Sequence, residues 1–275
     1  MKGQTVAVVC TATALMWCVG AETSYAQAWS GAYVAGTFGS GMQPERDNRI
    51  VRFDKTLDGD FSDTITTVAG VNAFSPGFCA GAAVSATPAG GCRQDDRAPD
   101  FSVRGGYDWQ TGRFVVGAVG EIASMNQIGS VSAFSTTPAS YTFTRELKWL
   151  GGVRGRAGYG TDRYLAYGTG GLTGANVDHS FSTSNVVNTF VPSGKAGVWG
   201  FQAGAGVEVR VSGRWSLGTE YLMTRLDDRD AFTVRVQGPA PATNAFILAN
   251  PAGSDLRRAD QFDFYAVRFT AGYRF

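Results

Sequence analysis

The chain has 275 residues, with 24 lysines and arginines against 23 aspartates and glutamates, so its net charge is close to zero. This balance argues against nucleic acid as a partner, because domains that bind nucleic acid carry a clear excess of basic residues. Glycine is unusually frequent at 37 residues, nearly twice the ~7% average share in proteins. The glycines are spread through patterned segments, which indicates tight curvature or crowded side chains opposite them.

The N-terminal segment predicts a secretory signal peptide over residues 1–26. Lys2 gives a positive start, residues 5–21 are apolar and uncharged, and small residues follow at Ala26 and Ala28. This order is typical of a signal peptide cleaved after Ala26 or Ala28. A permanent transmembrane helix is the alternative, but the apolar run is slightly short for one. Neither cysteine inside the segment follows a small residue, so we expect no lipoprotein anchor.

The remaining residues, 27–275, are numerous enough for one sizeable domain. No further apolar run approaches the length of a membrane-spanning helix, so a helical membrane protein is not expected. Two cysteines remain, Cys79 and Cys92, in a stretch rich in glycine, alanine and proline. An exported chain meets an oxidising compartment, so we predict a disulfide between them. A metal site is the alternative, but no histidine lies nearby and the spacing fits no zinc motif.

Alternating side chains predict eight β-strands. Successive side chains of a strand point to opposite faces, so a strict period of two indicates a strand with two different faces. The pattern is clearest in the final stretch QFDFYAVRFTAGYRF, where large apolar residues and small or arginine residues alternate. The predicted strands are Trp29–Gly39, Pro99–Gln110, Arg113–Met125, Tyr141–Gly160, Arg163–Ala175, Ala196–Val211, Arg214–Arg225 and Gln261–Phe275.

Short turns and long loops alternate along the chain. Three tight turns occur in DWQTGRF, YGTDRYL and VSGRWSL. The four long polar stretches are Gly41–Ala98, Asn126–Ala139, Asn176–Lys195 and Leu226–Asp260. Because the number of strands is even, both ends of the mature chain fall on the side of the short turns. The pattern predicts an all-β fold: an eight-stranded antiparallel transmembrane up-and-down β-barrel with short periplasmic turns and long extracellular loops.

Two architectures fit eight such strands. A soluble lipocalin-type barrel points its apolar face inward around a ligand, whereas an outer-membrane barrel points it outward into lipid. Aromatic residues favour the second, because they gather at the level of the short turns, as in a membrane-interface girdle. These residues are Tyr107, Trp109, Phe114, Tyr159, Tyr164, Trp215, Tyr273 and Phe275. The reverse orientation would place arginines and glutamates in hydrocarbon, at ~2–4 kcal/mol for a charge at the midplane.

The opposite strand faces carry charged residues beside glycines, which suits a crowded polar interior. The predicted lumenal charge network consists of Arg104, Glu121, Arg154, Arg156, Glu208, Glu220 and Arg268. An eight-stranded barrel has an interior just wide enough for its own side chains. We favour a plug of mutually satisfied ion pairs, because a buried charge needs partners. The other hypothesis is a gated narrow channel lined by these charges.

The strand sequences resemble a known family. The segments WSGAYVAGTFGSG, GGYDWQTGRFVVGAVGEI, WLGGVRGRAGYGTDRYLAYGTGGL, GFQAGAGVEVRVSGRWSLGTEYL and AGYRF are similar to the small outer-membrane "porin family" proteins of alphaproteobacteria, which form an OmpA-like eight-stranded barrel. The resemblance covers all eight strands but not the loops, and the first loop is longer than the family leads us to expect. It implies a protein of the Gram-negative outer membrane, surrounded by outer-membrane lipids and lipopolysaccharide and inserted by the barrel-assembly machinery.

Catalysis is not expected, and neither is a cofactor or a metal site. The only histidine is His179, between Asp178 and Ser180. Consecutive strand residues point to opposite faces, so these three side chains would meet only if a loop gathered them. We interpret His179 as a solvated loop residue. A lipid-modifying hydrolase or acyltransferase is therefore the least favoured class of function.

Two apolar segments interrupt the polar loops, VNAFSPGF over residues 71–78 and NAFILANP over residues 244–251. They either form contact sites for other surfaces or pack on each other. The sequence does not identify a partner for them. The function predicted is that of a non-enzymatic integral outer-membrane β-barrel with a role in envelope integrity and surface interaction. A narrow channel for small solutes is the alternative.

Overall fold

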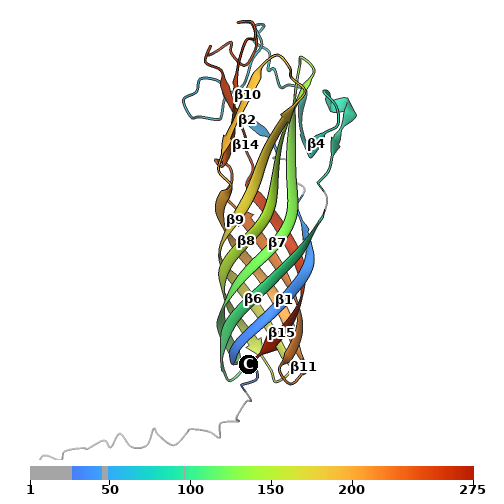
Figure 1. Cartoon of the computed structure of the whole chain (residues 1–275), viewed down its shortest axis with the longest axis vertical. Helices are drawn as coiled ribbons and strands as arrows, with labels where there is room; N and C mark the ends of the chain where they lie inside the picture. Colours follow the sequence, from blue (N-terminus) through green and yellow to red (C-terminus); the bar gives the residue numbers. More distant parts are fainter. Residues whose placement is uncertain (1–26, 45–48, 96) are drawn as a thin grey trace, which may run out of the picture.

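A computed structural model describes residues 27–44, 49–95 and 97–275 of the chain. The predicted signal peptide, residues 1–26, lies outside these described residues. Within them, no helix combines the length and the apolar character needed to cross a membrane. The architecture is all-β, with a long barrel that carries a cap of loops and short strands at one end (Figure 1).

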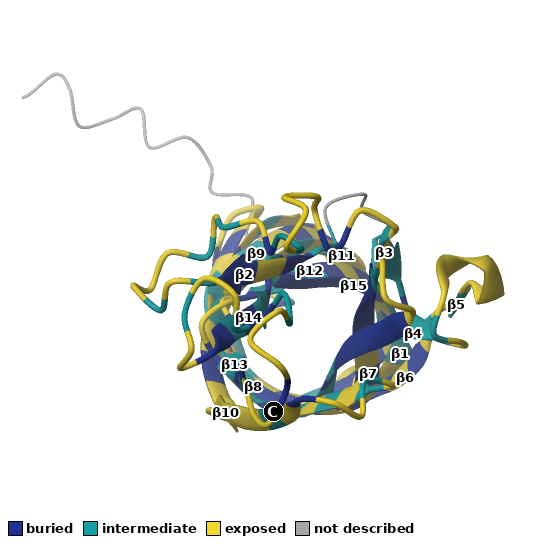
Figure 2. Cartoon of the chain, turned by 90° about the horizontal axis from the view of Figure 1, so that it is seen from above, coloured by how far each residue is buried: buried dark blue, intermediate teal, exposed yellow. Residues whose placement is uncertain are grey.

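Eight long antiparallel strands close into a ring. They are β1 (Gly31–Met42), β6 (Ala98–Thr111), β7 (Phe114–Ser135), β8 (Ala139–Gly160), β9 (Tyr164–Thr183), β11 (Gly197–Ser212), β12 (Trp215–Leu226) and β15 (Phe262–Arg274). Each strand pairs with its neighbours in this order, and β1 closes the ring by pairing with β15. Figure 2 shows the closed ring along its axis. The predicted fold class and all eight predicted strands are confirmed.

The three short turns lie together at one end of the barrel, which we call the short-turn end (Figure 1). Two of them connect their strands through only two residues, and the first of the two residues is a glycine in both turns. Gly112 has φ +60° and Gly213 has φ +44°, a left-handed conformation that glycine adopts without steric cost. The opposite, long-loop end carries the remaining connections.

The barrel continues at the long-loop end into a second layer of structure, which we call the head. Strands β7, β8 and β9 run past the other barrel strands and form one wall of it. A separate four-stranded sheet in the order β10-β13-β14-β2 forms another wall. Its strands are β10 (Thr189–Gly194), β13 (Phe232–Gln237), β14 (Ser254–Arg258) and β2 (Val51–Asp54).

The prediction of a long loop over Asn126–Ala139 is wrong. Strand β7 extends to Ser135 and β8 begins at Ala139, so the connection is only residues 136–138. The two strands stay paired because their inward side chains, Val131 and Phe143 among them, enter the apolar core of the head. The other predicted long loops also contain strands, because their apolar residues pack in the same core.

The first loop holds the remaining elements, β3 (Gly77–Ala80), β4 (Ala82–Ala83), the short 3-10 helix η1 (Pro88–Gly90) and β5 (Cys92–Arg93). The two apolar loop segments predicted from the sequence meet inside the head. The rings of Phe74 and Phe246 are 5.8 Å apart and both side chains are buried. These two phenylalanines therefore pack in the core of the head and are not exposed to other surfaces.

Exposed apolar side chains cover the outside of the barrel. Of the eight predicted girdle aromatics, seven are exposed and Tyr273 is half-buried. A second set of exposed aromatics, including Trp149 and Trp199, lies nearer the head. Trp149 and Tyr159 are ten residues apart on β8, which at ~3.3 Å per residue and a tilt of ~40° separates them by about 25 Å along the barrel axis. This height matches the apolar band of an outer-membrane barrel.

A β-bulge marks the upper limit of this band. The register of β8 against β9 shifts between Leu147 and Trp149, so Lys148 is an extra residue. Below the bulge the even-numbered residues of β8, such as Leu150 and Arg154, point inward, whereas above it Leu147 and Phe143 do. The bulge lets one strand serve both the barrel and the head.

A charge introduced at mid-height on the outside should destabilise the barrel. Leu172 is 70% exposed and pairs across the strands with Val153, halfway between the two aromatic levels. We expect Leu172→Arg to lower the free energy of unfolding from lipid vesicles by about 2–4 kcal/mol. The matched variant Val116→Arg, near the short-turn girdle, should cost about 0–1 kcal/mol. Equal costs in urea titrations would contradict this placement of the band.

Candidate functional site

The barrel interior contains a network of five arginines and five carboxylates. Its members are Arg104, Arg154, Arg156, Arg268, Arg274, Asp100, Asp108, Glu121, Glu208 and Glu220. All seven charges predicted from the sequence belong to it. Equal numbers of positive and negative groups leave the network formally neutral, which is how a low-dielectric interior tolerates ten charges.

Glu220 lies at the centre of the network. Its Oε2 accepts a hydrogen bond from Arg104 Nη1 at 3.0 Å and one from the Tyr167 hydroxyl at 2.9 Å. Its Oε1 accepts one from Arg154 Nη1 at 3.1 Å. These hydrogen bonds join residues from four different strands, β6, β8, β9 and β12. The carboxylate therefore ties opposite walls of the barrel together.

Glu121 bridges two arginines on the other side of the lumen. Its Oε2 accepts from Arg154 Nη2 at 2.9 Å, and its Oε1 accepts from Arg268 Nη1 at 2.6 Å. Arg268 also donates from Nε to Asp100 at 2.6 Å, and its side chain is completely buried. Glu220 and Arg268 are directly opposite each other on β12 and β15, but each forms its ion pairs with other residues.

Nearer the short-turn end, Asp108 is shared by two arginines. Arg156 donates from Nε to Asp108 Oδ1 at 2.7 Å and from Nη1 to Glu208 at 2.8 Å, while Arg274 donates to Asp108 Oδ2 at 2.7 Å. Asp100, Asp108 and Arg274 are not among the charges predicted from the sequence to form the network. The alternating pattern could have identified them, because each lies an even number of residues from Arg104 or Arg268 on the same strand. Residues spaced in this way point to the same face.

Inward-facing glycines make room for these side chains. A Cβ at Gly117 would lie 2.1 Å from Oδ1 of Asp108, a carboxylate of the network, and a Cβ at Gly171 would lie 2.6 Å from the Cα of Arg154. The residue opposite Arg154 on β9 must therefore lack a side chain. This crowding explains part of the high glycine content.

Apolar layers close the lumen on both sides of the charges. At the short-turn end Trp29, Val115, Leu165 and Tyr167 form a buried cluster, and Trp29 Nε1 donates to the carbonyl of Thr161 at 2.7 Å. On the head side, a second buried layer crosses the barrel. It consists of Ala98, Ala123, Met125, Leu147, Leu150, Ala175, Val177, Val198, Leu226, Ala231, Phe262, Phe264 and Ala266.

A second polar cluster lies above this layer, at the base of the head. Arg145 Nη1 donates to Asp228 at 2.9 Å and its Nη2 donates to Asp260 at 2.8 Å. Arg258 donates to Asp260 at 3.0 Å. Burial opposes ionisation of Asp260, but the charges of Arg258 and Arg145 lower its pKa from 3.8 to about 2. Burial also opposes ionisation of Asp228, and Arg145 and His179 lower its pKa.

The interpretation of His179 as a solvated loop residue is wrong. His179 lies on β9, its side chain is 6% exposed, and its Nε2 is 3.7 Å from Asp228. Its ring stacks on Phe232 at 5.3 Å. The neighbouring Asp178 and Ser180 are exposed on the other face of the strand. The error arose because β9 continues into a segment that was predicted to be a loop.

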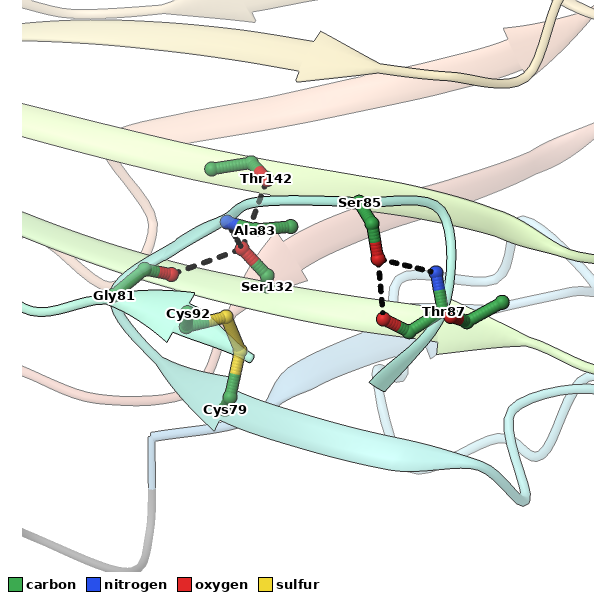
Figure 3. The surroundings of a disulfide bond; sticks show 8 residues. All are labelled: Cys79, Gly81, Ala83, Ser85, Thr87, Cys92, Ser132 and Thr142. Atoms are coloured by element: carbon green, nitrogen blue, oxygen red, sulfur yellow. Dashed lines mark hydrogen bonds between the residues drawn. A yellow bond between two sulfur atoms is a disulfide. The ribbon is translucent and has the colours of Figure 1, made fainter. Parts of the chain in front are cut away.

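The predicted disulfide is confirmed. Cys79 and Cys92 are bonded, with their Cα atoms 6.3 Å apart, and Figure 3 shows them beside Ser132 of β7. Ser132 Oγ donates to the Gly81 carbonyl and accepts from the Ala83 backbone N–H, both at 2.9 Å. The disulfide hairpin is thereby fixed to the wall of the head.

The tip of the head contains an uncharged cleft of about 470 Å³. Tyr141, Phe74 and Phe246 form its floor, and the Tyr141 hydroxyl accepts a hydrogen bond from Asn185 Nδ2 at 2.9 Å. Its rim exposes Val68, and also Val186, which is 93% exposed. The cleft can hold a neutral group, because its lining contains no ionisable charge to pair with an ion.

Comparisons with known proteins agree with this architecture. The family described as outer membrane protein beta-barrel domain matches residues 11–275. A 31 kDa outer-membrane immunogenic protein of Brucella melitensis biotype 1 is 35% identical over 137 residues, 48% of this chain and 55% of that protein. A 22 kDa outer membrane protein of Rhizobium leguminosarum bv. viciae is 30% identical over 125 residues, 46% and 51% of the two chains. The chain thus spans about half the length of the curated relatives that it matches.

Among solved structures, the outer membrane protein OprG from Pseudomonas aeruginosa is similar, with a TM-score of 0.50. The sequences are 11% identical, and the match covers 90% of this chain and 97% of that chain. At this level of identity the similarity concerns the fold alone. The comparisons confirm the resemblance that the strand sequences suggested.

Removal of one central carboxylate should destabilise the barrel strongly. We expect Glu220→Ala to lower the free energy of unfolding by about 3–5 kcal/mol, because it leaves buried Arg104 and Arg154 short of a partner. The control Asp227→Ala breaks an ion pair with Arg229 in which both side chains are about half exposed. Its expected cost is about 0–1 kcal/mol. Similar costs in urea titrations would show that the lumenal pairs contribute no more than surface pairs.

The head should lose stability in acid through Asp260. Its folded-state pKa of about 2 lies below the ordinary 3.8, so its stabilising contribution is present above about pH 4 and is lost as the pH falls towards 2. The shift corresponds to about 2 kcal/mol. Urea titrations of the wild type and Asp260→Asn should therefore differ most at pH 6 and converge by pH 2. A difference that does not depend on pH would exclude this charge as the cause.

Proposed function

Because the chain belongs to the outer membrane protein β-barrel domain family, we propose that it is a closed, non-enzymatic barrel that holds a folded head at the cell surface. The protein lies in the outer membrane of a Gram-negative bacterium. Its role in this proposal is twofold: the barrel contributes to the integrity of the envelope, and the head makes contacts with other surfaces.

The observation that carries the proposal is the filling of the lumen. A solute that enters from the short-turn end first meets buried Trp29, then the neutral network, and then the apolar layer that includes Leu150 and Phe262. An ion would have to separate buried pairs such as Arg154–Glu220 and then cross the apolar layer without partners. Both steps are costly in a low-dielectric interior.

The proposed surface role rests on the head. Its apolar core, its disulfide and the ion pairs of Arg145 make it an ordered body and not a set of free loops. Its tip presents the uncharged cleft with exposed valines at the rim. An uncharged surface that mixes apolar and polar groups in this way suits contact with another protein or a neutral molecule.

The barrel surface fits the partners that the family resemblance implies. The exposed apolar band, about 25 Å high, suits outer-membrane lipids, including lipopolysaccharide in the outer leaflet. The barrel-assembly machinery is the proposed partner during insertion. The only histidine, His179, stacks on Phe232 and lies 3.7 Å from Asp228. This buried position supports a non-enzymatic role.

Planar-bilayer conductance tests the closed lumen. We expect the refolded wild type to give no discrete current steps. The double variant Glu220→Ala, Arg268→Ala removes two side chains from the centre of the network and should give steps or leak current, if it retains its folded mobility on a gel. Regular steps from the wild type that change in size in the double variant would contradict the proposal and favour the small-solute channel.

A further inference from the structure

A small cavity at the short-turn end is lined by three arginines. It has a volume of about 190 Å³ and lies at the inner rim of the barrel, between the start of β1, the end of β15 and the turn from β11 to β12. Arg210, Arg214 and Arg274 contribute to its wall, together with the hydroxyl-bearing Ser30 and Ser216. The cavity is smaller than the ~300–1,000 Å³ of sites for whole small molecules, so it suits one charged group of a larger molecule.

The arginines differ in how their charge is satisfied. Arg274 pairs with the buried carboxylate of Asp108 at 2.7 Å. Arg210 donates to the carbonyls of Gly213 at 2.7 Å and Asp162 at 3.4 Å. Arg214 donates to the Tyr273 hydroxyl at 3.3 Å. Among the ion pairs of the described residues, neither Arg210 nor Arg214 has a carboxylate partner.

The negative groups near the cavity do not neutralise it. Asp108 is already shared by Arg156 and Arg274. The backbone carbonyl of Asp162 accepts a hydrogen bond from Arg210, and Asp162 is an exposed residue of the turn. Phe275 also lines the cavity, and its side chain carries no charge. The cavity therefore keeps an excess of positive charge that an anion can balance.

The cavity borders the aromatic girdle at Phe275. The ring centroids of Trp215 and Tyr273 are 5.2 Å apart, and those of Tyr273 and Phe275 are 5.4 Å apart. The guanidinium of Arg214 reaches the outward-facing Tyr273, and Phe275 is 67% exposed. Interfacial aromatics lie at the level of lipid headgroups. A headgroup that leaves the leaflet beside Phe275 therefore reaches the arginines over the rim.

We propose that this cavity binds the phosphate group of an anionic phospholipid of the periplasmic leaflet. The planar guanidinium groups of Arg210 and Arg214 match the oxygens of a phosphate in a forked geometry, and Ser30 and Ser216 add hydroxyl donors. The acyl chains of the lipid remain outside, against Tyr273 and Phe275. The site would fasten the last strand of the barrel to the inner leaflet.

Native mass spectrometry of the folded full-length protein in detergent tests this site. The probe is phosphatidylglycerol, with phosphatidylcholine of the same acyl chains and inorganic phosphate as separate arms. The wild type should bind phosphatidylglycerol in preference to phosphatidylcholine. The variant Arg210→Gln, Arg214→Gln should bind phosphatidylglycerol about tenfold more weakly or worse.

The matched control is Arg113→Gln, Arg163→Gln, which removes two arginines from other short turns of the same rim. It should change the affinity by less than about twofold. An equal loss in both double variants would reduce the effect to the general charge of the rim, and would overturn the proposal. No loss in either would also overturn it.

The inorganic phosphate arm separates the two sources of a phosphate group. Phosphate binding that depends on Arg210 and Arg214, while phosphatidylglycerol binding does not, would assign the cavity to a soluble anion and overturn the lipid proposal. Folding of each variant is verified by its heat-modifiable mobility on a gel. If the double variant does not fold, Arg214→Gln alone should weaken phosphatidylglycerol binding several-fold, and an unchanged affinity would count against the site.

Discussion

Closure of the ring by hydrogen bonds between β1 and β15 is the constraint on which the rest of the structure depends. In hydrocarbon every backbone polar group needs an internal partner, so a sheet can span a bilayer only if it has no free edge. The ten-residue register from Tyr33 opposite Arg274 to Met42 opposite Tyr265 removes that edge. Once the ring is closed, every strand has one face towards lipid and one face towards a narrow interior. The ion pairs, the glycines and the apolar layers are responses to that interior.

The chain satisfies two opposite solvation requirements along the same strands. Within the apolar band the outside is hydrophobic and the inside holds paired charges, whereas in the head the inside is hydrophobic. Strand β8 passes from one regime to the other at Lys148, where the bulge moves the inward set from even to odd positions. Lys148 itself remains outside and pairs with Glu146 at 2.7 Å, just above Trp149. The polar surface of the head thus begins where the lipid-facing surface ends.

A filled lumen and an ordered head fit together physically. Paired charges that cross the barrel from wall to wall resist deformation, because each separation leaves a buried charge without a partner. The apolar layer and the Arg145 cluster continue this connection up to the base of the head. The barrel therefore acts as a rigid support, and the proposed contacts lie at its two ends: the uncharged cleft at the tip and the arginine-lined cavity at the periplasmic rim.

The sequence by itself determined the strands, their order and the direction of their faces. Period-two alternation is a local property, so it was sufficient to point Arg154 inward and Trp149 outward and to indicate an even number of strands with alternating short and long connections. Local alternation did not reveal that β7 and β8 continue into the head, because the burial of Val131 and Phe143 depends on distant segments such as β13 and β14. It also could not show that Arg154 reaches both Glu121 and Glu220, or that His179 meets Asp228. Those contacts depend on the stagger and closure of the barrel, which set the height of each residue, and only the tertiary structure decides them.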